Sequence, residues 1–176
     1  VIPSEANFDS KWYWNNIRNL NYFMTRYQRV NATESEVNPV VAVIRLFRAF
    51  DYFDKIKTFG DVPWYEKDLT TADIDELYKA RDDRDFVLGK IIEDLEFAIE
   101  WLPEKSAAEV GALHKDAART FLARVCLHYG TYKKYHNVST SPTSQELLQK
   151  AATLAKEVMD SGLYDIVQGS DAGANQ

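Results

Sequence analysis

The sequence predicts an all-α fold built from antiparallel helical hairpins. Apolar residues recur with the period of a helix over most of the chain, and no segment alternates long enough to form a half-buried strand. Residues 33–36 and 143–146 have the Thr-x-x-Glu spacing of a capping box, each just before an apolar helical segment. Gly60, Pro103 and Gly162 stand where helical segments should end.

Length and composition indicate a single globular domain, and with the helical periodicity we expect one helical domain spanning residues 1–176. Hydrophobic residues make up 45% of the chain and charged residues 27%, which excludes a disordered chain. The formal net charge of −6 argues against a nucleic-acid partner. The longest apolar run, residues 40–44, is far shorter than the roughly 20 residues that a membrane-spanning helix needs.

Residues 8–30 are expected to form the first amphipathic helix. Trp14 falls roughly 140° from the centre of its apolar stripe, on the same face as Arg18 and Asn21. An aromatic plane beside such donors is suited to holding a sugar ring through stacking and hydroxyl hydrogen bonds. The simpler interpretation, which we favour, is that a neighbouring helix buries this face.

A second helix is expected from the capping box at residues 33–36 to Gly60, with Pro39 in its first turn. Its middle, residues 40–53, is apolar almost all round and is expected to be the most buried stretch. Asp54 lies on the apolar side of this helix. Because an unpaired buried charge is costly, we expect an arginine of an adjacent helix to pair with it.

Residues 59–81 show little periodicity. A connection of more than about 15 residues is unusual in a compact domain, and it is usually functional or held by packing. Trp64 and Tyr65 follow Pro63 on this loop, where ligand contact and loop packing are equally consistent interpretations.

Three further helices are expected, from Asp82 or Asp83 to residue 102, over residues 115–135, and over residues 144–161. Small residues at helical spacing recur in the second, fourth and fifth helices. Such positions let helices approach closely, as tetratricopeptide-like hairpins require, although no 34-residue period is kept.

No catalytic or metal site is indicated, so we expect a protein that is not an enzyme and needs no cofactor. Cys126 lies in an apolar helical segment and is expected to be a buried thiol. His128 and His136 are eight residues apart, too far for the i, i+4 pairing of a helical metal site. Three acids of the third helix are interpreted as part of a solvated face: Glu93, Asp94 and Glu96.

Three motifs follow one another in the first part of the chain: YWNNIRNLNYF at residues 13–23, RLFRAFDYFD at 45–54, and KTFGDVP at 57–63. Together with weaker matches that continue to about residue 165, they resemble the SusD/RagB family of outer-membrane nutrient-binding lipoproteins of Bacteroidetes. The FGDVP turn and its upstream helix are the specific part of this resemblance.

The resemblance implies an α-solenoid scaffold of tetratricopeptide-like pairs and a binding function without chemistry. Members of this family sit on the surface of the outer membrane through a lipidated N-terminal cysteine. They capture oligosaccharides or peptides and cover a SusC-like TonB-dependent transporter. Because family members are much longer, residues 1–176 are expected to be an internal portion, with the lipid anchor outside it.

We therefore expect a surface protein that binds glycans or other nutrients. Its candidate ligand contacts, chosen from the residues and not from any family motif, are Trp14, Arg18, Asn21, Trp64 and Tyr65. One alternative is a tetratricopeptide-type adaptor for protein segments. Another is an all-helical carbohydrate-active enzyme, which would need two carboxylates about 5 to 10 Å apart, and no such pair stands out.

Overall fold

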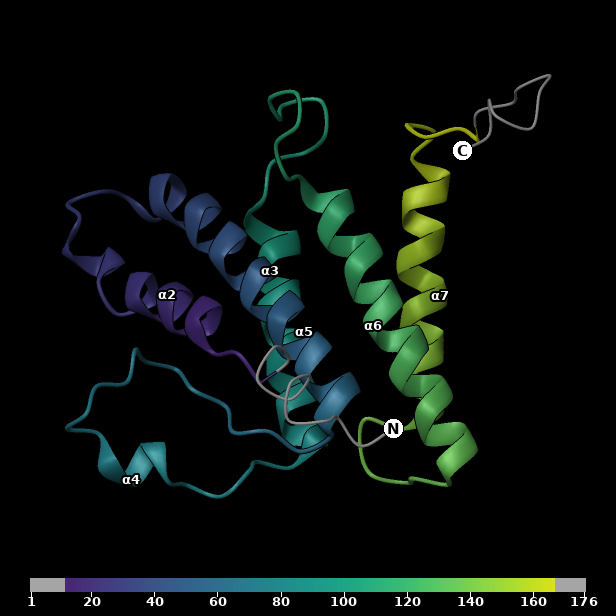
Figure 1. Ribbon diagram of the computed structural model, residues 1–176. Helices are drawn as coiled ribbons and strands as arrows, with labels where there is room; N and C mark the ends of the chain where they lie inside the picture. The colour runs from purple at the N-terminus through teal and green to yellow at the C-terminus, as the bar shows by residue number, and fades with distance from the viewer. Residues whose placement is uncertain (1–11, 167–176) are drawn as a thin grey trace, which may run out of the picture.

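The computed structural model describes residues 12–166, and this part of the chain contains helices and no β-strand, as predicted (Figure 1). The only extended pairing in that range is an isolated antiparallel bridge between Val62 and Asp82. The helices in chain order are α2 (Asn15–Met24), η1 (Tyr27–Arg29), α3 (Glu34–Phe59), α4 (Ile74–Leu77), α5 (Arg84–Trp101), α6 (Lys115–His136) and α7 (Ser144–Asp160).

Two antiparallel helical hairpins form the body of the structure. Helix α5 returns along α3, and α7 returns along α6, while α5 also packs against α6 and α2 against α3 (Figure 1). The packing of α6 on α7 needs a small residue at one position, because a Cβ at Gly130 would lie 2.8 Å from Cγ of Leu148. The predicted hairpin arrangement is therefore confirmed.

Both predicted capping boxes are present. The Glu36 carboxylate accepts the backbone N–H of Thr33 at 2.9 Å, and the Glu146 carboxylate accepts that of Thr143 at 2.7 Å. Helix α3 ends as expected before Gly60, whose φ of 75° is unfavourable for residues with a Cβ. The placement of Pro39 in the first turn was wrong, because it is the sixth residue of α3.

The first helix is shorter than predicted. Residues 15–24 form α2 and a separate 3₁₀ turn follows, whereas residues 8–11 of the predicted helix lie outside the described part of the chain. At its end the Thr25 hydroxyl lies 2.9 Å from the Asp68 carboxylate, and the Arg26 guanidinium donates to the same oxygen at 2.9 Å. A contact with a loop more than 40 residues away thus fixes this end, which periodicity cannot indicate.

The core lies where α3, α5, α6 and α7 face one another. Cys126 is buried there as predicted, and burial raises the pKa of its thiol to about 11. Residues 40–53 were expected to be the most buried stretch because they are apolar almost all round, yet one face of α3 there is exposed. Phe47 is 48% exposed and Phe50 54% exposed, because the packed neighbours cover the opposite side of the helix.

The buried carboxylate of this fold is Asp94. It is 1% exposed and accepts hydrogen bonds from Arg45 Nε at 2.6 Å and from Arg48 Nε and Nη2 at 2.7 and 2.8 Å. The interpretation of Asp94 as part of a solvated face was therefore wrong. The expectation for Asp54 was also wrong, since its side chain is 57% exposed and pairs with Lys57 of its own helix at 3.0 Å.

Replacing Asp94 by Asn should lower the free energy of unfolding by about 3–5 kcal/mol, because it leaves the Arg48 charge buried without its counter-charge. Chemical denaturation followed by circular dichroism measures the change. The matched control is Glu93→Gln, one residue away and exposed, which should change that free energy by less than about 0.5 kcal/mol. Equal effects of the two substitutions would contradict this account.

Candidate functional site

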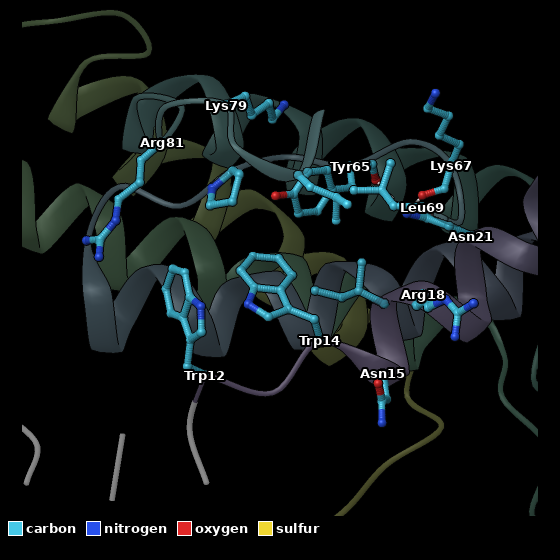
Figure 2. A pocket seen from close by; sticks show the side chains of 13 residues that line it. Trp12, Trp14, Asn15, Arg18, Asn21, Tyr65, Lys67, Leu69, Lys79 and Arg81 are labelled. Atoms are coloured by element: carbon cyan, nitrogen blue, oxygen red, sulfur yellow. Dashed lines mark hydrogen bonds between the residues drawn. The ribbon is translucent and has the colours of Figure 1, made fainter. Parts of the chain in front are cut away.

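A pocket of about 430 Å³ lies between α2 and the loop that follows α3. The segment just before α2 and the face of that helix form one side, and residues 63–81 form the other (Figure 2). Three aromatic rings and several polar side chains line the space: Trp12, Trp14, Tyr65, Asn15, Arg18, Lys67, Lys79 and Arg81. The pocket therefore combines apolar ring surface with nitrogen donors.

The rings of Trp12, Trp14 and Tyr65 form what we call the aromatic wall. The centroids of Trp12 and Trp14 are 5.2 Å apart and those of Trp14 and Tyr65 are 5.4 Å apart, both pairs in edge-to-face geometry. The Lys55 ammonium lies 4.6 Å from the centroid of the Trp14 ring, and burial lowers the pKa of this lysine. These contacts hold Trp14 half-buried, with part of its surface toward the pocket.

Tyr52 of α3 supports the loop side of the pocket from below. Its hydroxyl accepts the backbone N–H of Tyr65 at 2.8 Å, and its ring lies 6.1 Å from that of Trp14. Burial is the main reason why the pKa of the Tyr52 hydroxyl is raised, so the group remains a neutral hydrogen-bonding partner. Helix α3 thereby fixes the position of the Tyr65 backbone at the edge of the pocket.

Asn21 joins α2 to the loop. It is fully buried, and its amide donates to the backbone oxygens of Tyr65 at 2.7 Å and of Lys67 at 3.3 Å. Its side-chain oxygen accepts from Arg48 Nη1 at 3.2 Å. Every contact of this amide is with the protein, so Asn21 positions the pocket from its base.

Trp64 lies behind the pocket instead of in its lining. It is 4% exposed, its ring centroid is 4.2 Å from that of Tyr52, and the Arg48 guanidinium lies 4.9 Å from it. The backbone of Trp64 is fixed on both sides, because its N–H donates to Asp82 at 2.7 Å and its oxygen accepts from Lys79 at 2.7 Å. The structure thus brings Trp14, Arg18, Asn21 and Tyr65 to one pocket and places Trp64 beneath it.

The expectation that a neighbouring helix buries the Trp14 face of the first helix holds in part, because Tyr52 and Lys55 of α3 contact the Trp14 ring and Arg48 of α3 contacts Asn21. The rest of the cover is the loop of residues 61–81, which the Asn21 amide holds over α2. Sequence reasoning also missed Trp12, Lys67, Lys79 and Arg81 as lining residues. Their only signal in the sequence was that they lie on the same segments as Trp14 and Tyr65. The sequence does not show that these two segments come together in space.

Two carboxylates tether the outer part of the loop. Asp68 accepts hydrogen bonds from Arg26 and Thr25. These bonds, chiefly the one from Arg26, lower the pKa of Asp68 to about 2. Asp73 accepts from Lys67 Nζ at 2.6 Å and from the Thr70 backbone N–H at 2.8 Å, which lowers its pKa to about 2. Both carboxylates are therefore ionised while they hold the loop.

Within residues 12–166, no cluster of three or more His, Cys, Asp or Glu side chains is arranged to hold a metal ion. In the same range no helix is both long and apolar enough to span a membrane.

Comparison with known proteins identifies the family that has this architecture. A SusD-like family model, described as "Starch-binding associating with outer membrane", matches residues 4–127, which is more than half of the chain. The chain belongs to the SusD-like family. The predicted resemblance is confirmed, and with it the tetratricopeptide-like helical scaffold.

Individual SusD-like relatives agree with this assignment. SusD-like protein P2 of Formosa agariphila is 34% identical over 106 residues, 60% of this chain and 20% of the relative. A SusD-like crystal structure from Bacteroides fragilis is 26% identical, with a TM-score of 0.78 over 99% of this chain and 31% of that one. A laminarin-binding SusD-like protein is 24% identical, with a TM-score of 0.64 over 85% and 29%. The chain thus spans a third or less of each relative's length.

The loop should loosen in acid. A carboxylate whose folded pKa is depressed contributes stability above its unfolded pKa of 3.8, and this contribution is lost as the pH falls toward about 2. Hydrogen exchange of residues 65–77, corrected for the intrinsic rate, should therefore be faster at pH 2 than at pH 5. Asp73→Asn should make the exchange fast at both values.

Asp75→Asn is the matched control, because Asp75 makes no ion pair within residues 12–166. It should leave the acid dependence of the loop unchanged. Exchange that is equally slow at both pH values in the unmodified protein would show that these carboxylates do not hold the loop.

Proposed function

We propose that the chain is part of a surface glycan-binding protein that works with a SusC-like TonB-dependent transporter in nutrient uptake at the outer membrane. The observation that carries the proposal is the pocket in which the aromatic wall meets exposed nitrogen donors. A family described by starch binding and association with the outer membrane supports it, as does the relative that binds laminarin.

The proposed contacts follow from the chemistry of sugars. The C–H faces of a pyranose pack on aromatic rings, here those of Trp14 and Tyr65, while the hydroxyl groups accept hydrogen bonds from Arg18. Asn21 and Trp64 act in this proposal by positioning the loop that carries Tyr65. The polar groups of the pocket are amides and cations instead of the paired carboxylates of glycoside hydrolysis, so the proposed activity is binding without bond cleavage.

Trp14→Ala and Tyr65→Ala should each weaken the binding of an oligosaccharide by about 1–3 kcal/mol, the value of burying one ring. Isothermal titration against a panel that includes laminarin oligosaccharides measures the loss. Thermal melting of each variant must first show that it folds, because both rings contact Tyr52 or each other.

Tyr78→Ala is the control for this pair. Tyr78 is 85% exposed. Its neighbours in the sequence line the pocket, but Tyr78 itself does not. Its substitution should leave the affinity unchanged. Normal binding by the folded Trp14→Ala and Tyr65→Ala variants would overturn the proposed site, and binding of peptides without any glycan would favour the adaptor alternative.

The proposed partner and location are supported by the family alone, and they need an experiment of their own. Tagged full-length protein, purified from detergent-solubilised outer membranes, should carry a TonB-dependent transporter with it. Recovery of the protein from the outer membrane without such a transporter, under conditions in which membrane complexes survive, would contradict the partnership.

A further inference from the structure

The charge of the pocket is opposite to the charge of the chain. The formal net charge is −6, with 27 acidic residues, yet the described lining of the pocket contains four cations and no carboxylate. The four are Arg18, Lys67, Lys79 and Arg81. Such a reversal indicates a preference for negatively charged ligands at this position.

The two lysines are neutralised by the loop itself. Lys67 Nζ lies 2.6 Å from a carboxylate oxygen of Asp73, and Lys79 Nζ lies 3.0 Å from Asp82 and 3.8 Å from Glu76. These ion pairs fold the loop, so the lysines add little net charge to the pocket. The positive charge that remains is that of the two arginines.

Arg18 and Arg81 have no carboxylate within ion-pair distance among residues 12–166. Both are exposed, and the Arg81 guanidinium lies 5.1 Å from the centroid of the Trp12 ring. Figure 2 shows Arg81 at one end of the pocket and Arg18 at the other, with the rings of Trp12 and Trp14 between them. The aromatic wall is therefore bracketed by two guanidinium groups that have no counter-ion in the described chain.

We propose that this pocket takes an acidic oligosaccharide, with sugar rings on the aromatic wall and a carboxylate or sulfate group at Arg18 or Arg81. The inference rests on the proposed function and names the substrate class of the same site. Guanidinium groups bind planar or tetrahedral oxyanions through two parallel hydrogen bonds, which a neutral sugar cannot offer.

The test compares three oligosaccharides of equal length by isothermal titration at 50 and 300 mM NaCl, concentrations that bracket the ionic strength at which exposed charges are screened. The first is a neutral laminarin oligosaccharide, the second an oligogalacturonate and the third a sulfated carrageenan oligosaccharide. At least one acidic ligand should bind tenfold or more tightly than the neutral one at the lower salt. This advantage should shrink at the higher salt, and the two acidic arms distinguish carboxylate from sulfate.

The double substitution R18Q and R81Q should reduce the affinity for the preferred acidic ligand at least tenfold more than that for the neutral one. The matched control is R124Q, because Arg124 is also exposed and lies on α6 outside this pocket. It removes one charge without touching the site and should leave the preference intact. Loss of the preference in R124Q would show a general effect of net charge and would overturn the inference.

The outcomes separate this inference from the proposed function. If neutral glycans bind through Trp14 and acidic ones bind no better, the proposed function stands and this inference falls. If acidic ligands bind better but the double substitution leaves their advantage unchanged, Arg18 and Arg81 are not the anion site and the inference also falls. If no glycan binds at all, both are overturned.

Discussion

The contact between Arg48 and Asp94 is the interaction on which the pocket depends. It joins α3 to α5 in the core, and the same guanidinium also reaches Asn21 of α2 and the face of Trp64 on the loop. Asn21 in turn holds the backbone of Tyr65 and Lys67. One buried ion pair thus links the four segments that meet at the pocket, because the Arg48 guanidinium of α3 contacts a residue of each of the other three.

Most of the fold could be predicted from the sequence, because its signals are local. Capping boxes, Gly60 and the apolar period placed α3, α5, α6 and α7 to within a few residues. Apart from the position of Pro39 within α3, the errors concerned long-range contacts. Asp94 lies among apolar residues of a helix that is packed on two sides, by α3 and by α6, so a single apolar stripe could not indicate which of its acids is buried.

The candidate site was only partly predictable. Trp14, Arg18 and Tyr65 were chosen because aromatic and donor side chains stood at unexpected positions, and the structure brings them to one pocket. Their companions Lys79 and Arg81 could not be chosen, because the loop of residues 61–81 has no period from which its path could be predicted. That path is fixed by hydrogen bonds with Asn21, Tyr52 and Asp82, which come from three different segments of the chain.

The anchoring of the loop at Trp64 and Tyr65 has a consequence for the thermodynamics of recognition. Their backbone groups are already satisfied by Tyr52, Asp82, Lys79 and Asn21 before any ligand arrives. Little conformational entropy is then lost on association, which leaves more of the contact energy for affinity. Such a preformed cleft favours ligand binding without a large change in the conformation of the loop.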